Sequence, residues 1–188
     1  MKYQTIRDIP LLTPTGFKKQ LLRADIWAAI QQVYQALKVT EQEEHFDNMD
    51  KFIPGRNGQH PANLLSLDML PAIRDELLAE FGEIFREWVN VPIVPHAMYG
   101  IRSYKAGATL SPHVDRVSTH HVSAIVCVDK SVTKDWALDF CDHQGNWHEV
   151  FLEPGEVLLY ESAVCQHARL KPFEGDFYNN LFVHYTLQ

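Results

Sequence analysis

The chain has 188 residues, 46% of them hydrophobic and 22% charged, and its 17 basic and 24 acidic side chains give a formal net charge of −7. These values are ordinary for one globular domain, and an acidic chain without a basic block argues against nucleic acid or an anionic membrane as the main partner. Three cysteines are too few for a disulfide framework. At the N-terminus, residues 1–10 lack the apolar run of an export signal, and no later stretch has a membrane-spanning length, so we expect a cytoplasmic protein.

The first half of the chain, residues 1–90, is expected to be mainly helical. Apolar side chains recur every three or four residues over 17–38 and again over 71–88, which is the spacing of an amphipathic helix. Between these two segments, the acidic run Glu41, Glu43 and Glu44 is expected to form a solvated surface.

The second half changes to short β-rich runs separated by turn residues. Strands are expected over residues 97–105, 122–128, 136–140, 147–152, 156–161, 164–170 and 177–187. Short strands at this spacing are typical of a sandwich, a jelly roll or a small barrel. The sequence therefore predicts a single α+β domain over 1–188, in which a β core at residues 91–188 is packed on one sheet by the helices of residues 1–90.

The sharpest chemical motif is a histidine and a carboxylate two residues apart, His113 and Asp115. In an extended chain both side chains point to the same side. With one distant histidine they would form the two-His-one-carboxylate triad that binds Fe(II) and leaves coordination positions open. The pair alone is weak evidence, because such tripeptides are common by chance. Among the later histidines, His167 has the best position, since it lies within the expected strand 164–170.

The motifs around these residues resemble the prolyl 4-hydroxylase-type branch of the iron(II)/2-oxoglutarate dioxygenases. They are Tyr104 with Gly107, the run from Pro112 to Asp115, Pro154-Gly155-Glu156, and His167. The resemblance covers roughly residues 99–185 and implies a double-stranded β-helix, also called a jelly roll. It also implies Fe(II) held by His113, Asp115 and His167, 2-oxoglutarate and O2 as co-substrates, and succinate and CO2 as co-products. Ascorbate is a further candidate cofactor.

The far carboxylate of 2-oxoglutarate needs a cation, and here the sequence departs from the family. Prolyl hydroxylases typically carry a lysine or arginine about ten residues after the distal histidine, where this chain has Phe177. Strand alternation places Arg169 on the face of His167, and Arg102 on the face of Tyr104, which the resemblance turns inward. A guanidinium can bind a carboxylate through two parallel hydrogen bonds.

We therefore expect Arg169 to bind 2-oxoglutarate with help from the Tyr104 hydroxyl, and Arg102 is the second candidate. The alternative for either arginine is a surface position or a pairing with an internal acid.

The sequence leaves the substrate open. Arg116 directly follows the metal motif, and Asn180 lies on the last expected strand, so both are candidates for substrate contacts. The resemblance favours a prolyl residue of a peptide or protein, whereas two inward arginines leave a small molecule open. A different interpretation is a non-catalytic or 2-oxoglutarate-independent metal-binding β-helix protein, which the absence of a basic residue at Phe177 supports.

Overall fold

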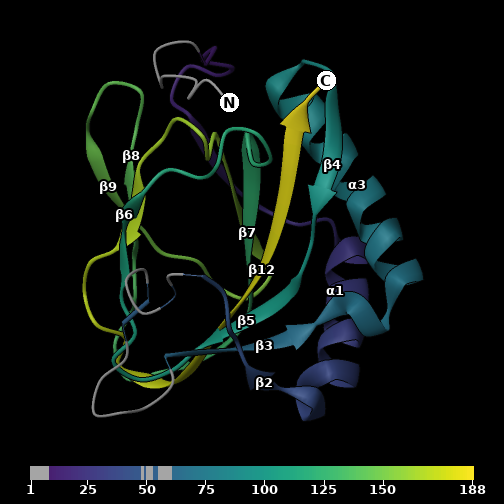
Figure 1. Ribbon diagram of the computed structural model, residues 1–188, viewed down its shortest axis with the longest axis vertical. Coiled ribbons are helices and arrows are strands. Elements are labelled where there is room, and N and C mark those ends of the chain that lie inside the picture. Colours follow the sequence, from purple (N-terminus) through teal and green to yellow (C-terminus); the bar gives the residue numbers. More distant parts are fainter. Residues whose placement is uncertain (1–8, 48, 50–52, 55–60) are drawn as a thin grey trace.

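The computed structural model describes residues 9–47, 49, 53, 54 and 61–188. Two antiparallel β-sheets enclose one apolar interior, and two long helices lie on the outer side of the larger sheet (Figure 1). This arrangement is the jelly roll that the sequence motifs predict.

The larger sheet has eight strands within the described residues, in the order β1-β10-β7-β12-β5-β3-β2, and β4 pairs with the other end of β12. Their bounds are Phe17–Leu21 (β1), Gln42–Glu43 (β2), Ala62–Ser66 (β3), Ile93–Ala97 (β4), Gly100–Tyr104 (β5), Val122–Val132 (β7), Glu156–Tyr160 (β10) and Gly175–Leu187 (β12). The smaller sheet has the order β6-β11-β8-β9. Its strands are Leu110–His113 (β6), Leu138–Cys141 (β8), Trp147–Val150 (β9) and His167–Arg169 (β11).

The two long helices are α1, Ala24–Leu37, and α3, Pro71–Val89, and two short 3₁₀ turns, Lys38–Thr40 and Leu67–Met69, lie beside them. Each helix buries one apolar stripe, as its three- and four-residue spacing requires. The buried side chains are Ile26, Ile30 and Val33 of α1, Leu77, Phe81 and Phe85 of α3, and Val126, Val183 and Tyr185 of the sheet beneath them. These contacts stiffen the central strands β7 and β12, whose opposite face lines the interior.

The first expected helix begins later than its apolar spacing indicates. Residues 17–21 form β1, which pairs antiparallel with β10 and places Phe17 opposite Tyr160. The hydrogen bonds of this edge strand outweigh the local helical pattern, and α1 starts only at Ala24. Because β1, β2 and β3 all join the larger sheet, the boundary expected at residue 91 for the start of the β core is wrong.

The strands expected between residues 97 and 113 also need correction. The strand expected over 97–105 is divided into β4 and β5. At the start of β5, Gly100 has φ +154°, and a Cβ there would lie 2.2 Å from the carbonyl oxygen of Leu65 on β3, so only glycine permits this close approach. The short strand β6, which ends at His113, was not among the expected strands.

Candidate functional site

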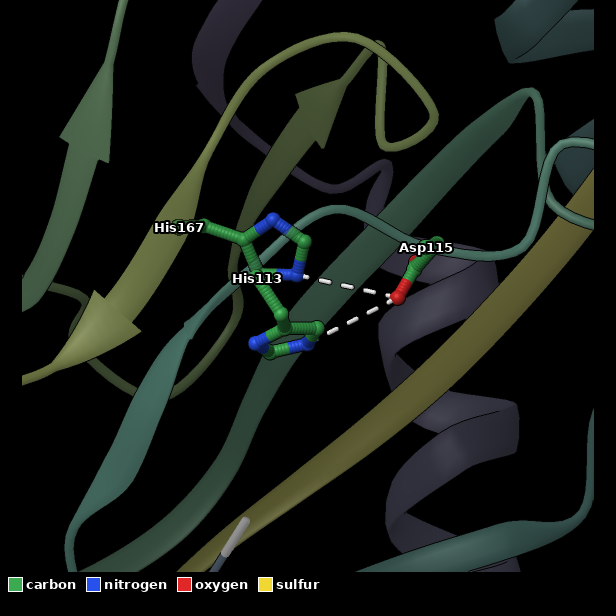
Figure 2. Close-up of side chains that lie close together, drawn as sticks. All are labelled: His113, Asp115 and His167. Carbon is green, nitrogen blue, oxygen red and sulfur yellow. Dashed lines mark ion pairs between the residues drawn. The ribbon is translucent and has the colours of Figure 1, made fainter. Parts of the chain in front are cut away.

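His113, Asp115 and His167 converge in the space between the two sheets (Figure 2). His113 ends β6 and lies directly opposite His167, which begins β11. Asp115 lies in the turn after β6, where its backbone N–H donates to the carbonyl of Ser162 at 2.8 Å. Asp115 Oδ1 is 3.7 Å from His113 Nε2 and 3.8 Å from His167 Nε2. Residues that are far apart in the sequence thus present two ring nitrogens and one carboxylate oxygen to a common point.

The protonation of the two imidazoles suits a metal ion. The Nδ1 of His113 lies 2.7 Å from the carbonyl of Ser111, and the Nδ1 of His167 lies 3.1 Å from the carbonyl of Cys165. Since a carbonyl only accepts, the proton sits on Nδ1 in each ring and the Nε2 lone pair faces Asp115. Burial lowers the pKa of His167 to about 4, and burial followed by the charge of His167 lowers that of His113. Both rings are therefore neutral at neutral pH.

The spacing of the three donor atoms also fits. An octahedral ion with bonds of about 2.1 Å requires neighbouring donor atoms about 3 Å apart, so small side-chain rotations would close the set. Two imidazoles and one carboxylate on one side of an ion match the donor set of non-haem Fe(II) oxygenases. The residues present therefore fit the metal that the sequence motifs imply.

A cavity of about 1010 Å³ contains this group. Of the other residues that the sequence nominated, its walls include Arg102, Tyr104, Arg116 and Arg169. Two further parts of the wall were not predicted, namely residues 42–47 on one side and the histidines His96, His120 and His184 on another. The cavity has room for a co-substrate and part of a substrate beside the metal ligands.

Arg169 is a deeply buried cation on the cavity wall, with 2% of its surface exposed. Its Nη1 donates to the carbonyl of Trp136 at 3.0 Å, and its guanidinium carbon lies 4.1 Å from the Trp136 ring centre and 4.8 Å from that of Tyr178. No carboxylate in the described part of the chain forms an ion pair with it. A buried charge without a counter-charge is costly, so the position favours an anion from outside the chain.

Arg102 also faces the cavity but has a protein partner. Its Nε donates to Glu44 Oε2 at 2.5 Å and its Nη2 to Glu44 Oε1 at 2.7 Å, while Nη1 lies 3.4 Å from the Tyr104 hydroxyl. The pairing with an internal acid, left open above, therefore holds for Arg102. The expectation that Glu44 is a solvated residue is wrong, because residues 42–47 cover the cavity and leave its side chain 11% exposed.

The two substrate candidates from the sequence differ in position. Arg116 lies on the cavity wall next to Asp115. Asn180 is fully buried on β12 and is not among the described residues that line the cavity. Its amide oxygen and nitrogen are both buried without a hydrogen-bond partner in the described structure. A direct substrate contact is therefore not supported for Asn180 in this arrangement.

Sequence reasoning missed three residues behind Asp115. Ser123, Ser162 and His184 form one hydrogen-bonded group there. None of the three belongs to a motif that the sequence offers. The register of β7 against β12, which places Ser123 opposite His184, was the missing information.

The neutral state of His167 predicts a loss of stability in acid for the metal-free protein. Its pKa is about 4 in the folded state against a usual 6.5, so the unfolded state takes up the proton first. The stability present above pH 6.5 is then lost as the pH falls toward 4, by about 2 kcal/mol at pH 5. We expect urea unfolding at pH 7.5 and pH 5.0 to show this loss in the wild type. The His167→Gln variant has no titrating group at this position, so its loss of unfolding free energy between the two pH values should be about 2 kcal/mol smaller. Equal losses in the two proteins would contradict a neutral His167 in the folded state.

Within the described part of the chain, no helix is both long enough and apolar enough to span a membrane.

No protein-family model matches this chain, and no curated protein sequence matches it. Solved structures do share its fold. A prolyl-4-hydroxylase from Pseudomonas putida superposes with a TM-score of 0.63 at 15% identity, covering 97% of this chain and 98% of that one. HygX from Streptomyces hygroscopicus, solved with nickel, 2-oxoglutarate and hygromycin B, gives 0.62 at 15% identity and covers 93% and 84%.

A third similar structure is a prolyl hydroxylase from Trichoplax adhaerens in complex with a hypoxia inducible factor peptide fragment. It gives a TM-score of 0.61 at 12% identity and covers 93% of this chain and 85% of that one. At these identities the comparison concerns the fold alone, and it confirms the jelly roll that the sequence motifs predict.

Proposed function

We propose that this protein is an Fe(II)- and 2-oxoglutarate-dependent dioxygenase that hydroxylates its substrate and releases succinate and CO2. The observation that carries the proposal is the meeting of two chemical groups in one cavity. The two imidazoles and one carboxylate of the His113, Asp115 and His167 set and the buried guanidinium of Arg169 both face it. The first set suits the metal, and the second suits the far carboxylate of a metal-bound keto acid.

Each residue then has a distinct task. His113, Asp115 and His167 would hold the metal, which together with 2-oxoglutarate and O2 supplies the oxidising chemistry when bound. Arg169 lies two residues beyond His167 on the short strand β11, so their α-carbons are roughly 6 to 7 Å apart. That spacing suits a five-carbon diacid lying between the metal and the guanidinium. Tyr104, buried beside Arg169, would orient the same carboxylate with its hydroxyl.

Arg102 has a lesser part in this assignment. It could bind the co-substrate only by leaving the two hydrogen bonds that it makes with Glu44. Breaking a buried ion pair exposes the other partner as an uncompensated charge. Arg169 has no such pair to give up among the residues that the structure describes, and we therefore assign the anchor to it.

The substrate is a prolyl residue of a peptide or protein, or a small molecule, and Arg116 on the cavity wall would contact it. The two classes correspond to the peptide seen with the Trichoplax adhaerens prolyl hydroxylase and the hygromycin B seen with HygX. Succinate formation measured with a panel of proline-containing peptides and with a panel of hydroxylated small molecules would separate them. Stimulation by one panel identifies the class.

The alternative is a metal-binding β-helix protein that does not use 2-oxoglutarate. It is favoured by Phe177, which occupies the place where prolyl hydroxylases typically carry the basic anchor. In that case Arg169 would be a structural residue stacked between Trp136 and Tyr178. Both interpretations keep the metal ligands, so they differ in co-substrate binding alone.

One anaerobic titration distinguishes the two. We expect Fe(II) followed by 2-oxoglutarate to produce the weak visible charge-transfer band of a keto acid chelated to iron. Succinate, which lacks the keto group, is the matched control and should produce no band. Tight Fe(II) binding without a band on adding 2-oxoglutarate would favour the alternative, and no Fe(II) binding would contradict both.

A further inference from the structure

A buried hydrogen-bonded group lies behind the carboxylate of Asp115, and we propose that it positions this carboxylate for the metal, with Ser123 as the central residue. The inference rests on the proposed metal site. It does not depend on 2-oxoglutarate or on the substrate.

Ser123 is the junction of this group. Its Oγ lies 3.4 Å from Asp115 Oδ2, 2.7 Å from Ser162 Oγ and 2.8 Å from His184 Nδ1. Ser123 is completely buried on β7, so water cannot replace these contacts. The Ser162 hydroxyl also lies 2.9 Å from the carbonyl of His120. Each polar atom near Asp115 Oδ2 is therefore held in turn by another part of the fold.

The positions of these residues in the sheets explain why they meet. Ser123 and His184 are direct partners on the neighbouring strands β7 and β12, and Ser162 follows β10 on the other side of β7. Asp115 comes from the turn after β6 in the smaller sheet. The group thus joins the metal-binding turn to three adjacent segments of the larger, helix-covered sheet.

The chemistry of the neighbours limits where the single hydroxyl proton of Ser123 points. Burial holds the pKa of His184 well below its ordinary value, so its ring is neutral and has one N–H. With that N–H at Nδ1, His184 donates to Ser123, whereas an ionised carboxylate can only accept. The Ser162 hydroxyl has one proton, which either the His120 carbonyl or Ser123 can accept. When Ser162 donates to Ser123, the Ser123 proton is left for Asp115 Oδ2.

The consequence is a fixed orientation of the metal ligand. With Oδ2 held by Ser123, the other oxygen, Oδ1, is the one that faces the Nε2 atoms of His113 and His167, at 3.7 and 3.8 Å. The carboxylate can then contribute one oxygen only, which leaves more positions on the ion open. Loss of a hydrogen-bond partner of a metal ligand typically lowers metal affinity by about 10- to 100-fold.

Cobalt(II) binding tests the role of Ser123 without relying on enzyme activity. The variant Ser123→Ala removes the donor, and Ser103→Ala is the matched control. Ser103 is an equally buried serine on β5, but its hydroxyl contacts Lys105 rather than a metal ligand. We expect the cobalt dissociation constant to rise by about 10- to 100-fold in Ser123→Ala and to stay at the wild-type value in Ser103→Ala. The visible d–d spectrum of the bound cobalt should change only in Ser123→Ala, because a freed carboxylate alters the coordination.

Two further variants keep the test decisive. Ser123→Thr retains the hydroxyl and should bind cobalt more tightly than Ser123→Ala. Ser123→Cys has nearly the same shape but a weak donor, and it replaces Ser123→Ala in the comparison if circular dichroism shows that the alanine variant does not fold. A wild-type affinity and spectrum in the folded variant without the hydroxyl would overturn the positioning role and leave the proposed function intact. Failure of the wild type to bind cobalt would overturn both.

Discussion

Replacing His167 with alanine should abolish metal binding and 2-oxoglutarate turnover while leaving the fold largely intact. The side chain supplies one of the three donor atoms that converge on a common point, and its removal leaves a two-ligand site. We expect the loss of affinity to exceed the roughly 10- to 100-fold typical for removing a partner of a ligand. Titration with Fe(II) under anaerobic conditions measures it directly, and succinate release measures turnover.

The control for this experiment is His148→Ala. His148 is a half-exposed histidine on β9 that pairs with Asp142 and lies outside the ligand set. The His148→Ala protein should bind metal with the wild-type affinity. Wild-type metal affinity in a folded His167→Ala protein would mean that the ion uses other ligands. That result would contradict the proposed metal site.

Replacing Arg169 with alanine should weaken 2-oxoglutarate binding by about two to three orders of magnitude and leave Fe(II) binding nearly unchanged. Removing one partner of a buried charge pair costs about 3–5 kcal/mol, and each 1.4 kcal/mol corresponds to a factor of ten in the binding constant. We expect less than the full upper value of that range, because the Tyr104 hydroxyl would still bind the carboxylate in the variant. Arg169→Lys should recover only part of the affinity, since an ammonium offers a point charge in place of a planar fork.

The measurement is the 2-oxoglutarate dependence of the visible iron chelate band, with Arg74→Ala as a control on the surface of α3. Because Arg169 also packs on Trp136, thermal unfolding must show that the variant is folded at the temperature used. Normal co-substrate binding in Arg169→Ala together with weak binding in Arg102→Ala would move the anchor to the opposite wall. Normal binding in both variants would contradict an arginine anchor in this cavity.

The prediction of the metal ligands needed little three-dimensional information. His113 and Asp115 are two residues apart, so they lie close together in almost any extended conformation. His167 was selected because it lies within the expected strand 164–170, and the dioxygenase resemblance then implied the same residue. The inward position of Arg169 followed from the same two-residue alternation, and His167 and Arg169 both line the cavity.

Expectations based on local periodicity were less successful where a distant strand competed. Residues 17–21 continue the apolar spacing of a helix, yet they form β1 because β10 offers an unpaired edge. Glu44 belongs to an acidic run that resembles a solvated surface, yet it pairs with Arg102 of β5 and covers the cavity. In both cases the partner lies far along the chain, so a short window of sequence does not include it.

The three residues that converge in the cavity, the jelly-roll class and the shared face of His167 and Arg169 were therefore within reach of the sequence, since these depend on residue type, order and a period of two. Only the three-dimensional arrangement shows which charges are paired and which carboxylate is hydrogen-bonded from behind. Arg102 is satisfied by Glu44 whereas Arg169 has no acidic partner among the described residues, and Asp115 meets Ser123 only because β7, β12 and the turn after β6 come together. Such contacts depend on the register and packing of elements distant in the chain, which residue spacing does not encode.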